Sequence, residues 1–335
     1  MVTVVCSRSA ERARDVADRF GVARWTTSYA DVVAATDVDA VLNLTPIQKH
    51  AEVTLAALAG GKHVYSEKPV AQTAAEVLQI RAAAAQVGCV VVTAPCVLLF
   101  PQVKRAREIL SSGSLGPVHS ARGSALGGVP PWEGYISDPS PFFSADAGPL
   151  LDMAVYPLHA LTGLLGSARR VTALAQQTRD TFRIASGPYA GKEIDVGTAD
   201  NWHLVLELDS GVLASVEANN CSAGSLAPEL EIAGEVGTMA VSLLDVAEPV
   251  RVLADGKVTE HPVLHGRASG PDHLLGVEHL VDCIEGGTEL TLSLDHAHHV
   301  LTVLEAARLS VSEGRTIDVG VRSGFALPTA VARAG

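Results

Sequence analysis

The first 117 residues alternate short apolar runs, rich in β-branched side chains, with longer amphipathic stretches. Apolar runs at 2–6, 23–27, 40–44, 62–66 and 89–93 are separated by helical patterns at 9–20, 28–36, 47–60 and 73–87. Strands that alternate with helices form βαβ units, whose strands lie in one parallel sheet. Because ligands bind beyond the carboxyl ends of strands in open α/β sheets, the residues that follow these runs are the first candidates for a site.

The pattern changes after Pro117, where apolar and polar residues begin to alternate. Alternating runs occupy 119–128, 169–179, 201–220 and 229–244, and helical patterns occupy about 150–165, 272–285 and 295–311. Such alternation, joined by turns, is typical of antiparallel sheets. The sequence predicts two closely joined domains: an α/β domain over 1–118, and an α+β domain over 119–335 with a large, mostly antiparallel open sheet covered on one face by helices.

The composition excludes several classes of partner. The formal net charge is −12, whereas binding to nucleic acid or to an anionic membrane needs a basic surface. The uncharged stretch between Arg81 and Lys104 is broken by Gly88, Pro95 and Pro101, so we expect a buried strand there and no membrane span. The five cysteines include no C-x-x-C pair, and no signal-peptide pattern begins the chain. We expect a cytoplasmic protein with reduced thiols.

Polar residues follow two neighbouring strands of the predicted parallel sheet. Lys68 lies just beyond the run at 62–66, and His50 lies in the first turn of the helix after the preceding run. A lysine beside a proline is most often a surface residue, so each position alone is a weak signal. The candidate residues at this edge are Thr45, Pro46, His50, Glu67, Lys68 and Pro69.

A second candidate cluster lies in the segment 146–166. If this segment is one helix, Asp152 and Tyr156 are four residues apart on a shared face, and His159 lies further along the same stripe. A second interpretation explains these residues without a functional site. In it, Tyr156 would be a half-buried core aromatic, Asp152 would interact with the helix dipole, and His159 would be solvated.

The order and separation of these segments resemble the Gfo/Idh/MocA oxidoreductase family. The resemblance runs from residue 1 to about 320, through "TP…H…ALAGGKHVYSEKP", "ILSSGSLGPV", "GPLLDMAVY" and "SLDHAHHVLTVLEAARLSVSEGRTIDV". It implies that 1–118 is a Rossmann-like dinucleotide-binding domain and that Lys68 faces a nicotinamide and a substrate hydroxyl. It also implies that Asp152 and Tyr156 match the family's Asp-x-x-x-His/Tyr pair, with Tyr156 as the acid/base.

The implied reaction moves a hydride between a nicotinamide and a carbon that bears oxygen. A tyrosine with a pKa near 10 is a poor base at neutral pH, but a neighbouring ammonium lowers such a pKa by roughly 1–3 units. We expect Lys68 to supply that charge and to stabilise a developing alkoxide. Asp152 would orient a hydroxyl or the lysine. In the reverse direction Tyr156 would protonate the alkoxide that forms from a ketone.

The choice of cofactor depends on the residues that follow the first apolar run. NAD sites commonly place a carboxylate at the end of the second strand, whereas the 2′-phosphate of NADP needs cationic and hydroxyl donors. Ser7 and Arg8 occupy this position. The sequence therefore favours NADP over NAD, and over a merely solvated Arg8. The full set of expected cofactor-binding residues is Ser7, Arg8, Thr45, Pro46, His50, Glu67, Lys68 and Pro69.

The glycine-rich loop that normally cradles a dinucleotide pyrophosphate has no counterpart in the chain. No G-x-G-x-x-G occurs in the 335 residues. By the resemblance, the first strand, this loop and the first helix are missing ahead of Met1, so we expect a misassigned start or a truncated chain. Without the central strand, the parallel sheet would be split between the strands at 2–6 and 39–43 and would be unstable.

The expected substrate is a sugar, cyclitol or related polyol. Its contacts would be Lys68, Asp152, Tyr156, His159 and Trp132. Trp132 lies with Tyr135 and Phe142 in the segment 127–143, which we expect at the mouth of the pocket, although such aromatics often only pack a loop.

An open antiparallel sheet has a face that must be covered, so we expect a homodimer or homotetramer that forms through the C-terminal sheet. The histidines of "DHAHH" (295–299) are expected in a solvated helix entry, and no metal site is predicted. The alternative function is a non-catalytic ligand-binding or regulatory protein of the same fold, which the absent glycine loop favours.

Overall fold

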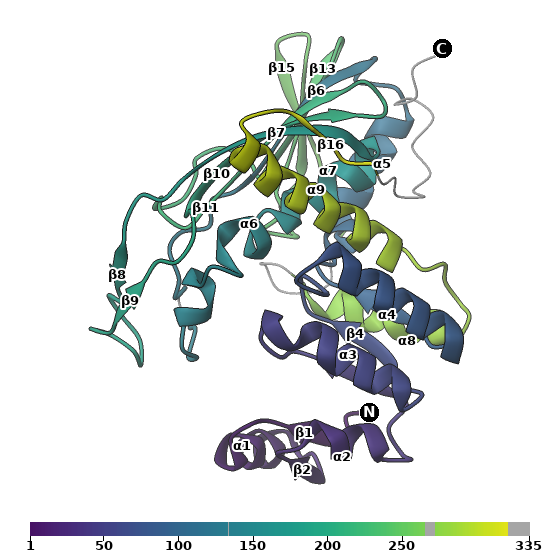
Figure 1. Cartoon of the computed structure of the whole chain (residues 1–335). Helices are drawn as coiled ribbons and strands as arrows, with labels where there is room; N and C mark the ends of the chain where they lie inside the picture. Colours follow the sequence, from purple (N-terminus) through teal and green to yellow (C-terminus); the bar gives the residue numbers. More distant parts are fainter. Residues whose placement is uncertain (133, 265–271, 321–335) are drawn as a thin grey trace.

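The computed structural model describes residues 1–132, 134–264 and 272–320. Its N-terminal part alternates strands and helices in the predicted order (Figure 1). The strands are β1 (Val4–Cys6), β2 (Arg24–Thr26), β3 (Ala40–Asn43), β4 (His63–Ser66) and β5 (Val91–Thr93), and the helices are α1 (Ala10–Phe20), α2 (Tyr29–Ala34), α3 (His50–Ala59), α4 (Ala74–Val87) and α5 (Pro101–Ser111). The paired strands are parallel, as predicted.

Local signals explain where these helices begin and end. Ser9 accepts a hydrogen bond from the backbone N–H of Arg12 at the start of α1, and Gly21 ends this helix in the left-handed conformation. Thr73 and Glu76 form a reciprocal capping box at the start of α4. α3 packs on β3 and β4, and α4 packs on α3. Because β3 and β4 are parallel, their carboxyl ends lie at one edge of the sheet.

The parallel sheet is divided into two pieces. β1 pairs only with β2, and β3, β4 and β5 form a separate sheet in that order, with no described strand between β1 and β3. Figure 1 shows β1, β2, α1 and α2 grouped at one end of the molecule, beyond α3. This is the split expected for a 3-2-1-4-5-6 sheet that lacks its central strand. Its instability stays a prediction.

The C-terminal part is built on a large mixed sheet. Among the described residues, nine strands lie in the order β15-β14-β13-β12-β6-β11-β10-β7-β16. Of the strand pairs described in this sheet, only β6–β11 is parallel, so the predicted, mostly antiparallel sheet is confirmed. The strands are β6 (Val118–Ala125), β7 (Ala168–Gln176), β10 (Asn201–Leu208), β11 (Leu213–Asn219), β12 (Leu230–Gly234), β13 (Gly237–Val241), β14 (Val250–Ala254), β15 (Lys257–His261) and β16 (Ile317–Asp318).

Helices cover one face of this sheet, and no helix among the described residues covers the other, which we call the open face. α9 (Leu294–Glu313) packs on β7, and α7 (Val155–Leu165) packs on β6 (Figure 1). The approach of α7 requires glycine at Gly123, because a Cβ there would lie 2.7 Å from the Cβ of Pro157. On the open face the side chains of Val205 and Leu213 are exposed.

The predicted helix over 150–165 is wrong in one respect, because it consists of two helices. α6 (Gly148–Asp152) ends before Met153, and α7 starts at Val155. Pro157 has no N–H, and its ring would clash with the carbonyl four residues earlier, at Met153. The break therefore lies where Pro157 excludes a continuous helix, and it sets Asp152 and Tyr156 on different helices.

Two further features complete the fold. α8 (Leu274–Ile284) packs against β4 and β5. A two-stranded arm, formed by β8 (Thr181–Arg183) and β9 (Glu193–Asp195), extends from the large sheet (Figure 1). In the part of the chain that the structure describes, no helix combines the length and the apolar character needed to cross a membrane. The division into domains after residue 118 stays a prediction.

Candidate active site

An ion pair between Lys68 and Asp152 joins the two parts of the molecule. Lys68 follows β4, and its Nζ donates a hydrogen bond of 2.5 Å to Oδ1 of Asp152 at the end of α6. The same Nζ donates a second bond of 2.7 Å to the backbone carbonyl of Asp152. The two side chains are only 14% and 10% exposed. Two residues predicted from separate segments of the sequence are therefore in direct contact.

Tyr156 lies beside this pair. The Nζ of Lys68 lies 5.1 Å from the centroid of the Tyr156 ring, within the range of a cation–π contact. Although the helix break separates Asp152 from Tyr156, the turn at 153–154 keeps both close to Lys68. We call Lys68, Asp152 and Tyr156 the Lys68 cluster.

Burial, rather than the lysine, dominates the acidity of the Tyr156 phenol. Burial raises the pKa of Tyr156, the Lys68 ammonium lowers it, and Asp152 raises it again, with a net increase above 10. Lys68 thus acts on this pKa in the expected direction, but burial outweighs it in the protein without ligands. The negative charge of Asp152 opposes the effect of the Lys68 ammonium on the phenol. The phenol keeps its proton at neutral pH and is suited to donate it.

Lys68 stays charged despite its burial. Burial lowers the pKa of the ammonium, but Asp152 and Tyr156 raise it by more, so the net shift is upward. The second carboxylate oxygen of Asp152, Oδ2, is buried and has no hydrogen-bond partner among the described residues. A buried carboxylate oxygen without a donor is costly, so this atom is available to a ligand hydroxyl or amide.

The loops after β3 and β4 are tied together by hydrogen bonds. The Nε2 of His50 lies 2.6 Å from the carbonyl oxygen of Thr45, and its Nδ1 lies 2.6 Å from the carbonyl oxygen of Pro69. The peptide bond between Lys68 and Pro69 is cis. His50 is only 2% exposed, so it supports the edge of the sheet from inside.

Asn43, which the sequence analysis did not select, organises the same edge. Its Nδ2 donates to the carbonyl oxygen of His50, and its Oδ1 accepts from the hydroxyl of Thr45. The backbone N–H of Glu67 donates to the carbonyl oxygen of Asn43. Its position, as a polar residue at the end of the apolar run at 40–44, is the sequence feature from which this role could have been predicted. Pro46 begins the short 3₁₀ turn that leads into α3.

Ser7 and Arg8 lie beyond the carboxyl end of β1. The N–H of Ser7 donates to the carbonyl oxygen of Thr26, and its hydroxyl accepts weakly from the N–H of Ser9, while Arg8 is exposed. Within the described ranges, no hydrogen bond or ion pair links Ser7 or Arg8 to the Lys68 cluster. These residues belong to the separate β1–β2 piece of the sheet.

The aromatic residues of the segment 127–143 pack on one another. The Trp132 ring makes edge contacts with Tyr135 and Phe142, at centroid distances of 6.4 and 5.2 Å. Its Nε1 donates to the carbonyl oxygen of Gly127. Burial raises the pKa of Tyr135, and the Asp152 carboxylate raises it further, which places this phenol within electrostatic reach of the Lys68 cluster.

His159 is not solvated, so the alternative interpretation of this residue is wrong, while its role as a substrate contact stays a prediction. His159 is 4% exposed, and its ring contacts that of His296, with the centroids 4.6 Å apart. His296 and His299 are 1% and 0% exposed, so the expected solvated helix entry is also wrong. Both predictions failed because α7 and α9 pack on each other as well as on the sheet, and this contact removes their polar positions from water. Over the described residues, no group of three or more potential metal ligands converges.

Two segments of the chain, which together make up more than half of it, match two models of one family. Residues 1–94 match the "Oxidoreductase family, NAD-binding Rossmann fold" domain, and residues 103–240 match the "GFO/IDH/MocA C-terminal domain". A mouse trans-1,2-dihydrobenzene-1,2-diol dehydrogenase is 25% identical over 321 residues, which is 92% of this chain and 88% of the relative. The match therefore extends over nearly the whole described molecule.

A second relative is more similar over a shorter span. The dTDP-3,4-didehydro-2,6-dideoxy-alpha-D-glucose 3-reductase of Streptomyces violaceoruber is 35% identical over 185 residues, or 54% of this chain. That match spans about half of the relative, 51% of its length. A levoglucosan dehydrogenase solved with NADH and L-sorbose shares the fold, with a TM-score of 0.80, 22% identity, and coverage of 96% of this chain and 90% of its own. The chain belongs to the Gfo/Idh/MocA family of nicotinamide-dependent oxidoreductases.

Proposed function

We propose that this protein transfers a hydride between a nicotinamide cofactor and a hydroxyl or ketone carbon of a sugar, cyclitol or related polyol. The contact of Lys68 with Asp152 and Tyr156 carries this proposal, because it combines a buried cation, a carboxylate and a phenol at the carboxyl edge of a parallel sheet. The names of the relatives, which include a sugar-nucleotide reductase and a diol dehydrogenase, support the substrate class.

The residues of the β3–β4 edge fit the nicotinamide half of the cofactor. Lys68 and Thr45 border this edge, and the unpartnered Oδ2 of Asp152, at the end of α6 beside it, is left as an acceptor for a substrate hydroxyl. Pro46, in the loop after β3, and Glu67 and Pro69, in the loop after β4, would also contact the cofactor. A nicotinamide supplies the acceptor or donor of the hydride at this place.

The protein's own groups would handle the proton and the developing charge. Tyr156 holds a phenolic proton, which it would donate to the carbonyl oxygen of a ketone substrate. The Lys68 ammonium would stabilise the oxygen as negative charge develops on it. Asp152 would hold Lys68 in place through Oδ1 and orient a substrate hydroxyl through Oδ2. Trp132 would present part of its ring to the apolar face of the sugar.

We further propose NADP as the preferred cofactor. Arg8 is exposed at the end of β1, and Ser7 offers a hydroxyl beside it, so the pair suits a ribose 2′-phosphate. The expected result is a higher kcat/KM with NADPH than with NADH. Arg8→Ala should reduce that ratio, and an unchanged ratio contradicts this choice.

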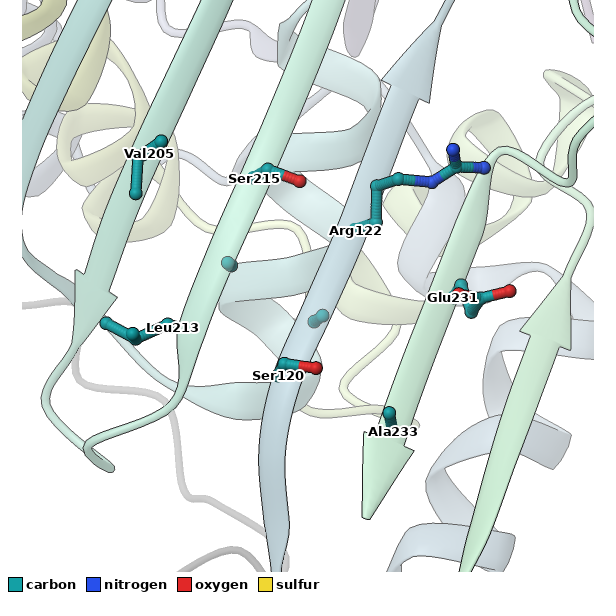
Figure 2. A pocket seen from close by; sticks show the side chains of 9 residues that line it. Ser120, Arg122, Val205, Leu213, Ser215, Glu231 and Ala233 are labelled. Carbon is teal, nitrogen blue, oxygen red and sulfur yellow. The ribbon is translucent and has the colours of Figure 1, made fainter. Parts of the chain in front are cut away.

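The open face of the large sheet is proposed as the contact with a second copy of the chain. A hollow of about 320 Å³ on this face is lined by residues that include Arg122, Val205, Leu213 and Glu231. Figure 2 shows the side chains of these residues. Arg122 and Glu231 are direct partners across β6 and β12, so a two-fold axis through this face can bring opposite charges together. Val205→Glu should convert an oligomer to monomers in analytical ultracentrifugation, and an unchanged mass contradicts the proposal.

The proposed chemistry is tested with the purified protein and a panel of keto-sugars and keto-cyclitols, by following the oxidation of NADPH and NADH. Turnover that is lost in Lys68→Met and in Tyr156→Phe supports the proposal, and rates that these substitutions leave unchanged contradict it. The absence of a G-x-G-x-x-G sequence favours a second candidate, a non-catalytic ligand-binding protein. Cofactor binding by calorimetry without turnover on any substrate would support that candidate.

A further inference from the structure

We propose that His50 is a positioning residue, which locks the loop containing Thr45 to the loop containing Lys68 and does so completely only as the imidazolium ion. The inference deepens the proposed function, because its effect on turnover rests on the role of Lys68. The two contacts of the His50 ring belong to the fold itself, so they can be tested in a protein that shows no turnover.

The donors and acceptors around the His50 ring determine its protonation when both contacts form. Each ring nitrogen lies 2.6 Å from a backbone carbonyl oxygen, at Thr45 and at Pro69. Carbonyl oxygens only accept hydrogen bonds, whereas a neutral imidazole has one N–H donor and one bare nitrogen. Only the imidazolium ion donates to both oxygens. The neutral ring holds one loop and presents a lone pair to the other.

These two contacts lead directly to the Lys68 cluster. Pro69 follows Lys68, whose Nζ bonds to Asp152, so the carbonyl of Pro69 anchors the backbone next to the proposed catalytic lysine. On the other side, Thr45 is held through its hydroxyl by Asn43, which also fixes the first turn of α3. Loss of one His50 bond therefore releases one of two loops that the proposed cofactor and substrate would contact.

The charges around His50 determine the pH at which the second bond is lost. Burial lowers the pKa of His50, while the carbonyl oxygens of Pro69 and Thr45 raise it. The charged neighbours act in opposite directions, because Glu67 raises this pKa and Lys68 lowers it. The net pKa lies below 6.5. We therefore expect both loops to be held at acidic pH and one contact to weaken as pH rises through this pKa.

Two substitutions separate the two contacts. The amide nitrogen of His50→Asn reaches the position of Nδ1 and can donate to the Pro69 carbonyl oxygen. The amide nitrogen of His50→Gln reaches the position of Nε2 and can donate to the Thr45 carbonyl oxygen. Neither amide titrates, so each variant keeps one contact at every pH. Lys49→Gln is the matched control, because it changes the neighbouring residue, whose side chain is 56% exposed and pairs with Glu52 at the surface.

The activity measurement compares kcat of each variant with kcat of the wild-type protein from pH 5 to pH 8. Because other titrating groups are common to both proteins, the ratio isolates the effect of His50. We expect a ratio near one at the alkaline end of this range and a reduction, by up to about tenfold, as pH falls through the pKa of His50, on the scale of one charge-assisted hydrogen bond. KM should change less than kcat, and Lys49→Gln should follow the wild-type profile. A ratio that does not vary with pH contradicts the proposal.

The second measurement uses NMR on the wild-type protein without cofactor or substrate. The ¹⁵N shifts of the His50 ring should show both nitrogens protonated at low pH, and the ¹³C shift of the Thr45 or the Pro69 carbonyl should move with the same midpoint. Carbonyl shifts that do not follow the His50 titration overturn the inference, whether or not the protein is an active oxidoreductase. A protein without turnover but with coupled shifts retains the inference and loses the proposed function.

Discussion

Lys68 and Asp152, separated by 84 positions in the sequence, share a hydrogen bond of 2.5 Å in a setting where both side chains are nearly excluded from water. This contact places a carboxylate beside the cation that faces the Tyr156 phenol. Burial raises the pKa of Tyr156 most, the Lys68 ammonium lowers it and the Asp152 carboxylate raises it again, so the net shift is upward. Tyr156 is therefore favoured as a proton donor, which corresponds to the reductive direction of the proposed reaction.

Breaking this ion pair should destabilise the protein, apart from any effect on activity. Lys68→Met leaves the Asp152 carboxylate buried without its cation, and the expected loss is about 3 kcal/mol in the free energy of unfolding. The double variant Lys68→Met with Asp152→Asn should lose less than the sum of the two single variants, because neither charge is then left alone. Urea unfolding of the four proteins at pH 7 measures these values. Strict additivity would show that the two side chains do not interact in solution.

Tyr156→Phe should reduce the rate of ketone reduction by about 10²–10⁴-fold, the usual contribution of a general acid, with little effect on stability. The upward shift in the pKa of Tyr156 also sets the pH profile. Because the protonated phenol is the active form, reduction should be independent of its ionisation through neutral pH and should fall only above pH 10. Alcohol oxidation should rise with pH over the same range. Steady-state rates in both directions from pH 6 to pH 10.5 provide the measurement, and an alkaline limb that persists in Tyr156→Phe would assign it to another group.

The sequence predicted the alternation of strands and helices, the change to an antiparallel sheet, and the segments that meet at Lys68, because each depends on local periodicity or on the general rule for strand ends. The break in the helix before Val155 was also detectable, since Pro157 cannot continue a helix from Met153. The burial of His159 was not detectable, because it depends on how α7 and α9 pack together. The pKa of Tyr156 likewise depends on burial, which the spacing of residues does not reveal.

The buried histidines should make the protein sensitive to acid. Burial, with a further contribution from His299, lowers the pKa of His159 to about 3, against a value near 6.5 in the unfolded chain. The native state therefore requires the neutral ring. The stability that this provides is complete above pH 6.5 and is lost as pH falls from 6.5 towards 3, by about 1.4 kcal/mol for each pH unit.

His159→Leu removes this titration and should give a shallower decline in the free energy of unfolding between pH 6.5 and pH 4.5. Urea unfolding at several pH values measures the slope. His119→Gln, at an exposed position, is the matched control and should keep the wild-type slope. Equal slopes for His159→Leu and the wild-type protein would mean that His159 is protonated in the native state, in conflict with its burial.

The piece of the structure formed by β1, β2, α1 and α2 should open more readily than the rest of the parallel sheet. Within the described part of the chain, β1 and β2 pair only with each other. The buried residues of α1 are Ala13 and Ala17, whereas α2 has none. In contrast, Val64 and Val92, in β4 and β5, are completely buried. Local opening is governed by buried apolar contacts, so we expect amides of β1 and β2 to exchange about 100-fold faster than those of β4 and β5. Hydrogen exchange followed by mass spectrometry at pH 7 measures this difference, and equal protection of the two pieces would show that they open as one unit.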